Sequence, residues 1–203
     1  MKEYEIDYGS FIGGWYIPED VCDDVIDLYN SEKENWIDGE CGHNEVNYNY
    51  KKSTEMHINP PDYSKKLSTY LPQLSNCLNA YRQKYPYCDS VDVYNLLGTN
   101  IKIQHYKPGE GFYEWHHEND GRTTINRHLV FMTYLNTLDN GGTDFFHQKI
   151  TTPCHKGLTV IWPAHWTHVH KGVTNYVSDK YIITGWYSFN AIEFRVDTPS
   201  RGI

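Results

Sequence analysis

The spacing of hydrophobic residues changes character about half-way along the chain. A short apolar run begins at Phe11, and from Pro18 to Tyr29 apolar and acidic residues take the three- and four-residue spacing of an amphipathic helix. Residues 64 to 85 repeat that spacing, and Pro72 is expected to kink or divide this second helix. The first half therefore predicts a strand followed by two helices.

From about residue 91 the pattern becomes one of short β-like runs separated by Gly, Pro, Asn and Asp. Eight such runs follow one another without a helical segment: VDVYNLL, NIKIQHY, GFYEWHHE, HLVFMTYLN, TDFFHQ, LTVIWP, WTHVHKG and KYIITGWYSF. Strands in this arrangement predict a mainly β fold, an antiparallel sandwich or jelly roll, with the two helices packed outside one sheet. We expect a single domain over 1–203, with helical support at about 11–90 and a β core at about 91–195.

Composition agrees with a globular, strand-rich domain. The chain has 203 residues, 18 Tyr and 6 Trp, and a formal net charge of −8, which argues against non-specific binding to nucleic acid or to an anionic membrane. Its five cysteines are scattered and show no CxxC spacing, so we expect reduced thiols in a cytoplasmic protein. The acidic start MKEYEIDYGS does not resemble a signal peptide, and no apolar run is long enough to span a bilayer.

The stretch FYEWHHENDG contains a candidate metal-binding pair. On a strand, His116 and Glu118 would point to the same side, because side chains alternate with a period of two. A second histidine cluster follows in PAHWTHVHKG, where alternation does not choose between His168 and His170. Two histidines and one carboxylate form the facial triad of non-haem Fe(II) enzymes that activate oxygen.

A lysine downstream strengthens the metal interpretation. Lys180 opens the apolar run KYIITGWYSF, where a lysine would ordinarily be a solvated edge charge. Beside a metal site its ammonium can instead bind the far carboxylate of a dicarboxylic cosubstrate.

These motifs together resemble a known family. The blocks YKPGEGFYEWHHE, YLNTLDNGGTDF, WPAHWTHVHKG and KYIITGW have the order and approximate spacing of the prolyl 4-hydroxylase-like iron(II)/2-oxoglutarate dioxygenases, from Tyr106 to Trp186. The resemblance implies a double-stranded β-helix of the jelly-roll, cupin-like type. It also implies Fe(II), 2-oxoglutarate and O2 as cofactor and cosubstrates, with ascorbate as a further cofactor.

The resemblance assigns the metal ligands. The family's His-x-Asp falls on His116 and Glu118, and its distal histidine falls on His170, because Lys180 lies about ten residues further on. Glu stands where most of the family has Asp, and its extra methylene displaces the carboxylate by more than about 1 Å unless the backbone compensates. Asp120 is the alternative carboxylate.

The resemblance also assigns the cosubstrate site. Lys180 and Tyr106 are similar to the residues that hold the distal carboxylate of 2-oxoglutarate, and Thr143 resembles the family's threonine on the neighbouring strand. Because GGTDF is one residue shorter than the commoner motif, Asp144 is an alternative to Thr143. Trp186 is expected to be structural.

The expected activity is hydroxylation of a C–H bond with release of succinate and CO2. A prolyl residue of a peptide or protein is the first-choice substrate, and a free amino acid or small metabolite is the alternative. No side chain beyond the metal ligands is expected to be catalytic. A cupin-like metal-binding module without turnover is a competing interpretation, as is a zinc hydrolase, which would leave Lys180 and Tyr106 without a role.

Two loops are candidates for substrate contact, since rigid β scaffolds commonly carry binding residues on their connections. Residues 36–52 correspond in position to the loop that folds over peptide substrates in prolyl hydroxylases. The aromatic candidates in this loop are Trp36, Tyr48 and Tyr50. The second loop, residues 118–127, carries Arg122 and Arg127, either of which can meet an acidic group.

Overall fold

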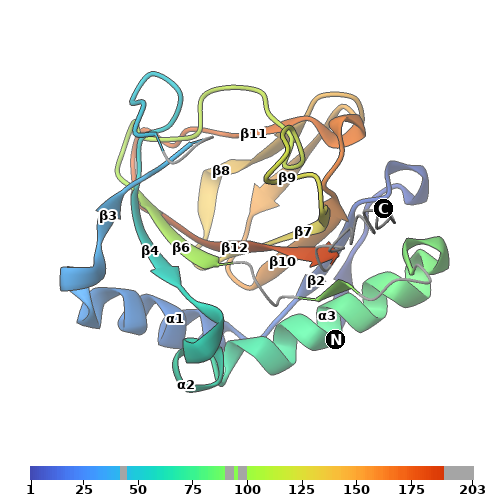
Figure 1. Cartoon of the computed structure of the whole chain (residues 1–203), viewed down its shortest axis with the longest axis horizontal. Helices are drawn as coiled ribbons and strands as arrows, with labels where there is room; N and C mark the ends of the chain where they lie inside the picture. The colour runs from blue at the N-terminus through green and yellow to red at the C-terminus, as the bar shows by residue number, and fades with distance from the viewer. Residues whose placement is uncertain (42–44, 90–93, 96–99, 190–203) are drawn as a thin grey trace, which may run out of the picture.

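Two antiparallel sheets face each other in the computed structural model, which describes residues 1–41, 45–89, 94–95 and 100–189 (Figure 1). In the described residues the larger sheet has the order β1-β2-β10-β7-β12-β6-β4-β3, with β5 paired to β12, and the smaller has the order β11-β8-β9. The strands are β1 (Lys2–Tyr4), β2 (Gly13–Tyr16), β3 (Ile37–Asp38), β4 (Thr54–Ile58), β5 (Tyr94–Asn95), β6 (Ile101–Tyr106), β7 (Arg127–Tyr134), β8 (Leu138–Phe145), β9 (Ile150–Cys154), β10 (Leu158–Pro163), β11 (His170–Gly172) and β12 (Lys180–Phe189). The predicted mainly β fold of the double-stranded β-helix type is confirmed.

The helices cover the outer face of the larger sheet (Figure 1). They are α1 (Glu19–Ser31), α2 (Tyr63–Lys66) and α3 (Tyr70–Lys84), and short 3-10 turns cover Tyr8–Ser10, Lys33–Asn35, Pro60–Asp62, Pro86–Cys88 and Trp166–His168. The predicted second helix is divided into α2 and α3, and Pro72 lies in the first turn of α3, where its missing N–H costs no helical hydrogen bond.

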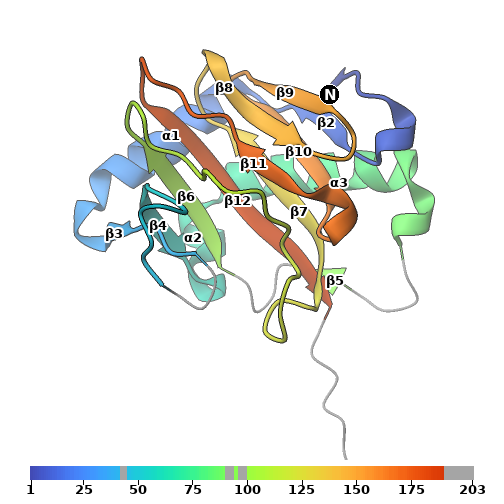
Figure 2. The same cartoon turned by 90° about the horizontal axis from the view of Figure 1, so that it is seen from above.

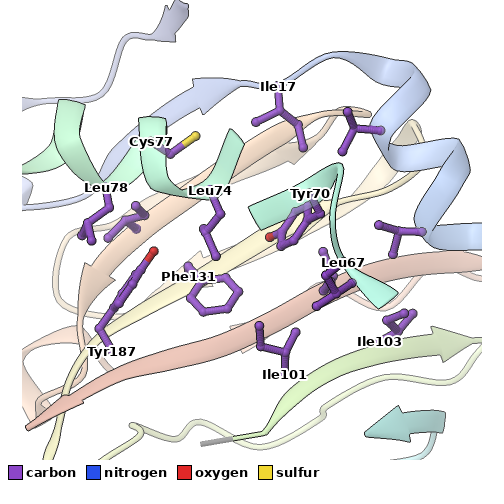
Figure 3. Close-up of a cluster of buried hydrophobic side chains, with 14 of the residues drawn as sticks. Ile17, Leu67, Tyr70, Leu74, Cys77, Leu78, Ile101, Ile103, Phe131 and Tyr187 are labelled. Carbon is purple, nitrogen blue, oxygen red and sulfur yellow. The ribbon is translucent and has the colours of Figure 1, made fainter. Parts of the chain in front are cut away.

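A large apolar core lies between α3 and the larger sheet (Figure 3). Tyr70, Leu74 and Leu78 of α3 point towards Phe131 and Tyr187 of the sheet. These side chains recur every three or four residues on α3 and every second residue on the strands, so the spacing seen in the sequence produces this contact. Packing against the helices holds the larger sheet in place, and the opposite face of that sheet is turned towards the smaller sheet.

A second core occupies the space between the two sheets. Phe145 from β8 and Trp162 from β10 meet there edge to face, with ring centres 5.3 Å apart. The same space also holds buried polar side chains, among them His170 and Lys180. Since burying a charge without a partner is costly, the interior of this β structure is the place to look for a binding site.

Several predicted strand boundaries are wrong. The run GFYEWHHE forms only isolated bridges at Phe112 and His116, and WTHVHKG begins as the 3-10 turn Trp166–His168 before β11. Strands β4 and β9 were not predicted. Of the run VDVYNLL only Tyr94 and Asn95 are described, and both lie in β5; the rest lies outside the described residues.

Seen from above, the long strand β12 crosses the centre of the larger sheet between β6 and β7 (Figure 2). Lys180 opens β12 directly opposite Tyr106, the last residue of β6. None of the helices in the described part of the chain is both long and apolar enough to cross a membrane.

Candidate metal centre

Backbone hydrogen bonds bring together the three predicted metal ligands. His116 and His170 exchange two backbone hydrogen bonds of 3.0 and 2.9 Å, which form an isolated antiparallel bridge. The Glu118 N–H donates to the carbonyl oxygen of Ala164 over 3.0 Å, so the segment that carries His116 and Glu118 is fixed at both residues. The side chains therefore converge although this segment is not a regular strand.

The ligand atoms of the three side chains lie within 4.8 Å of one another. The Glu118 Oε1 atom is 3.6 Å from His116 Nε2 and 3.4 Å from His170 Nε2. Each Nδ1 atom lies beside a carbonyl oxygen, that of Glu114 for His116 and that of His168 for His170. Since a carbonyl only accepts, both Nδ1 atoms carry the proton, and in the neutral rings both Nε2 lone pairs face the carboxylate.

The electrostatics of these groups suit a bound cation. Although burial raises the pKa of Glu118, the adjacent His116 and His170 rings, in their protonated form, hold that pKa well below its usual range. Burial lowers the pKa of His170. A charged carboxylate and a neutral imidazole are the forms that bind metal. Three facing lone pairs repel one another unless a cation lies between them, so the donor set fits a divalent metal.

The outer oxygen of Glu118 is held by two side chains. Trp186 Nε1 donates to Glu118 Oε2 over 2.9 Å, and Arg127 Nη1 lies 3.4 Å from the same oxygen. These contacts leave Oε1 towards the histidines and give the longer Glu carboxylate a fixed position. Trp186 was expected to be structural; it also contacts this candidate ligand, a role that the sequence did not indicate.

The alternatives to the predicted ligands lie apart from the cluster. His168 does not share a strand face with His170, because it lies in the 3-10 turn Trp166–His168; its Nε2 is hydrogen-bonded to the carbonyl oxygen of Ser10 at 2.9 Å. Asp120 accepts a hydrogen bond from Thr124 over 3.2 Å. Neither residue belongs to the group of potential ligands found among the described residues.

A buried lysine lies in the same cavity. Lys180 is 6% exposed, and its Nζ donates to the carbonyl oxygen of Gly142 over 3.2 Å. Within the described ranges no carboxylate forms an ion pair with it, and burial lowers the pKa of Lys180 to about 8, although Cys154 and Asp144 act in the opposite direction. A buried ammonium group without a carboxylate partner is stabilised by a bound anion. Lys180 therefore suits the far carboxylate of a dicarboxylic acid.

The other predicted cosubstrate residues line the same cavity as Lys180. The Tyr106 ring centre is 5.9 Å from Lys180 Nζ, and the Tyr106 hydroxyl donates to Gln104 over 2.7 Å. Thr143 is buried and lines the cavity, whereas the Asp144 carboxylate accepts a hydrogen bond from the exposed Thr151 over 2.6 Å. Thr143 is therefore the better placed of the two alternatives.

The cavity has a volume of about 720 Å³ and contains both the three-residue cluster and Lys180. Of the predicted loop residues, Tyr50 and Arg127 line it. Trp36 does not line this cavity, because it stacks on Tyr29 with ring centres 4.6 Å apart. Tyr48 is exposed and donates to Asp38 over 2.8 Å, and Arg122 is exposed as well.

A buried acidic residue beside the cavity was missed by the sequence analysis. Glu55 of β4 is fully buried and forms ion pairs with Lys51, His57 and Lys102. Although its burial acts in the opposite direction, Lys51 and the other partners lower the pKa of Glu55 to about 2. The polar residues in TEMHI alternate with apolar ones, and this alternation was the available signal for a strand with one polar face. Gln104 links the network to Tyr106, since its Nε2 donates to Glu55 over 2.9 Å.

A family model matches the part of the chain that carries this site. Residues 101–188 match the model of the 2OG-Fe(II) oxygenase superfamily. The match supports a 2-oxoglutarate-dependent dioxygenase of that superfamily. The superfamily implies Fe(II), 2-oxoglutarate and O2. A search of curated proteins finds no match.

Solved structures of prolyl hydroxylases share the fold of this oxygenase. A prolyl-4-hydroxylase of Pseudomonas putida is 14% identical, covers 89% of this chain and 93% of its own, and has a TM-score of 0.64. A prolyl hydroxylase of Trichoplax adhaerens in complex with a peptide fragment of hypoxia inducible factor is 16% identical, with coverages of 88% and 84% and a TM-score of 0.66. The viral collagen prolyl hydroxylase of Paramecium Bursaria Chlorella virus-1, as a 2OG complex, is 18% identical, with coverages of 90% and 98% and a TM-score of 0.64. At these identities the likeness is one of fold.

Proposed function

We propose that the whole chain acts as one Fe(II)- and 2-oxoglutarate-dependent hydroxylase domain. His116, Glu118 and His170 would hold the iron, and Lys180, Tyr106 and Thr143 would hold the distal carboxylate of 2-oxoglutarate. The observation that carries the proposal is that Lys180, buried and without a carboxylate partner in the described part of the chain, shares one cavity with the three candidate metal ligands.

When bound, iron(II) with 2-oxoglutarate and O2 supplies the oxidising chemistry that converts a C–H bond into C–OH and yields succinate and CO2. The chain's own residues position the reactants. Lys180 provides the charge that orients the cosubstrate, and the Trp186 indole and Arg127 guanidinium keep the Glu118 carboxylate in place. The apolar rings around His116 and His170, such as Phe112 and Trp162, limit access of water.

A prolyl residue of a peptide or protein is the first substrate that we propose, because one of the similar structures is a prolyl hydroxylase with a bound peptide. A free amino acid or small metabolite is the second. A small substrate is favoured because residues 50–52 are hydrogen-bonded to residues 111–113 across one side of the cavity, which narrows the entrance for a peptide. The Tyr113 N–H donates to the Tyr50 carbonyl and the Lys52 N–H to the Gly111 carbonyl, each over 2.9 Å. Ascorbate is proposed as an activator.

A titration without oxygen tests the proposal. Ferrous iron and 2-oxoglutarate are added to the purified protein, and the visible charge-transfer band of a chelated keto acid is expected. Air is then admitted and succinate is measured. A protein that binds iron and shows no such band would favour the metal-binding module or the zinc hydrolase.

Lys180→Ala separates cosubstrate binding from metal binding. We expect a loss of 2-oxoglutarate affinity of tenfold or more with little change in metal affinity. Lys65→Ala, which removes an exposed lysine of α2, is the matched control and should alter neither. Equal losses of both affinities in Lys180→Ala would contradict the assigned role.

A further inference from the structure

A second positive region lies on the cavity wall, at the other end of the strand pair that carries Lys180. In the register of β6 and β12, Lys180 is opposite Tyr106 and Lys102 is opposite Thr184. The two positions are four residues apart on the strands, or about 14 Å. Because the two positions differ by an even number, Lys102 and Lys180 lie on the same face of the sheet, and both line the cavity.

Lys102 shares the carboxylate of its ion pair with another lysine. Its side chain is 17% exposed, and in the described part of the chain its only ion pair is with Glu55, at 3.6 Å. That carboxylate is in closer contact with Lys51 and is also hydrogen-bonded to His57 at 3.0 Å. Burial lowers the pKa of Lys102, and the nearby charges of Lys51 and Arg127 act in the same direction, against the effects of Glu55 and Glu40. One buried carboxylate thus serves two lysines.

Arg127 adds a further positive charge at the same place. Its Cζ lies 3.7 Å from the ring centre of Trp186, and Lys102 Nζ lies 5.9 Å from that centre. The carboxylate nearest to Arg127 is that of Glu118, which would be shared with the metal in the proposed function. Lys102 and Arg127 therefore lie against one indole ring, in the cavity that also holds the metal cluster, and the carboxylates of their ion pairs, Glu55 and Glu118, are each shared with other groups. Glu40 and Asp120 line the same cavity.

We propose that the substrate of this oxygenase presents a carboxylate to Lys102 and Arg127. The inference rests on the proposed function, since it concerns the substrate of that same site. A carboxylate would accept hydrogen bonds from both side chains and place the adjacent carbon skeleton beside the Trp186 ring, next to Glu118. The hydroxylated carbon then lies on a residue that carries or adjoins a carboxylate.

A free amino acid and an acidic peptide both supply a carboxylate, and two pairs of probes distinguish these sources. The first pair is L-proline and L-prolinamide, which differ only in the free carboxylate. The second pair is a blocked prolyl peptide with aspartate after the proline and the same peptide with asparagine. Binding is measured calorimetrically to the protein loaded with Mn(II) and 2-oxoglutarate in the absence of oxygen, so that no turnover is required.

We expect at least one acid to bind ten times or more tightly than its amide. If the proline pair shows this difference, the substrate is a free amino acid. If the peptide pair shows it, the substrate is an acidic peptide. An outcome in which no acid binds more tightly than its amide overturns the proposal, and this comparison needs only the unaltered protein.

Lys102→Met tests the assigned residue, because it removes the charge and preserves most of the length. It should reduce the ratio of acid to amide affinity to within about twofold of one, whereas the exposed Lys65→Met should leave the ratio unchanged. A ratio that is unchanged in a folded Lys102→Met protein would show that Lys102 serves only to balance Glu55. Thermal unfolding and 2-oxoglutarate titration of the same samples report whether the variant is folded.

The charge-transfer band separates this proposal from the one on which it rests. If the unaltered protein gives no band with iron and 2-oxoglutarate, the proposed function fails. If the band appears and the acids bind no better than the amides, the proposed function stands and only the carboxylate site is overturned.

Discussion

The indole N–H of Trp186 donates a hydrogen bond of 2.9 Å to the Oε2 atom of Glu118, and this contact links the last long strand to the candidate metal ligand. Trp186 lies on β12, whereas Glu118 follows β6, so the bond joins residues 68 positions apart. It provides a physical reason why glutamate would serve as a ligand where the family more often has aspartate: the outer oxygen of the longer side chain has a fixed donor.

Trp186→Phe should weaken metal binding by about 10–100-fold, because partners of a ligand orient it and their loss usually has effects of this size. The ring is retained, so the fold should persist. The measurement is the Mn(II) or Co(II) dissociation constant, with the exposed Trp166→Phe as control. Equal metal affinities in Trp186→Phe and the unaltered protein would show that the hydrogen bond does not position Glu118.

His170→Ala should affect mainly metal binding, and His168→Ala should affect mainly the free energy of unfolding. His170→Ala should lower metal affinity by 100-fold or more. His168→Ala should leave it within about threefold and lower the free energy of unfolding by about 1–3 kcal/mol, because the buried carbonyl of Ser10 loses its partner. Metal titration and urea unfolding measure the two effects. Loss of metal binding in His168→Ala at unchanged stability would show that His168, and not His170, is the metal ligand.

The affinity for 2-oxoglutarate should fall by about tenfold between pH 7 and pH 9. Burial lowers the pKa of Lys180 to about 8, so in the free protein Lys180 is mainly protonated at pH 7 and mainly neutral at pH 9. A carboxylate bound beside it holds the proton. Calorimetry with Mn(II)-loaded protein measures the effect.

Lys180→Arg is the control for this pH dependence, because a guanidinium remains charged throughout this range. The variant should show a nearly constant affinity from pH 7 to pH 9. The same decline in Lys180→Arg as in the unaltered protein would assign the titration to another group.

Glu55→Gln should lower the free energy of unfolding at pH 7 by about 3–5 kcal/mol, since removal of one partner leaves buried lysine charge uncompensated. Urea unfolding measures the change, and the exposed Glu34→Gln is the control, expected within about 0.5 kcal/mol. A loss below about 1 kcal/mol would show that water compensates the lysines.

The same carboxylate predicts a pH dependence of stability. The pKa of Glu55 is about 2 in the folded protein, below the value of about 4.3 for an unfolded chain. Its contribution is therefore fully present above pH 4.3 and is lost as the pH falls towards 2. Glu55→Gln should show a smaller loss of stability over this range than the unaltered protein.

The sequence predicted those parts of the molecule whose signal is local. Helical spacing and Pro72 located α1 and the division between α2 and α3, and period-two alternation located β6, β7, β10 and β12. His116, Glu118 and His170 were linked by family motifs, and the structure brings their ligand atoms together.

Features that depend on distant residues escaped the prediction. Alternation placed His168 and His170 on one face, but the turn at Trp166–His168 separates them, and it is held by a bond from His168 to Ser10, 158 positions away. The buried partners of Glu55 and the bond from Trp186 to Glu118 likewise arise only when separate strands meet. No local spacing encodes such contacts.

The three candidate ligand atoms that face one another also connect the stability of the folded protein to the supply of metal ions. A chain that folds before it acquires a cation places three electron-rich atoms within 4.8 Å of one another at its centre. A metal that binds only the native state adds RT ln(1 + [M]/Kd) to its stability. If the proposed function holds, scarcity of iron would thus lower the stability of the folded chain, and the abundance of the protein would fall together with its activity.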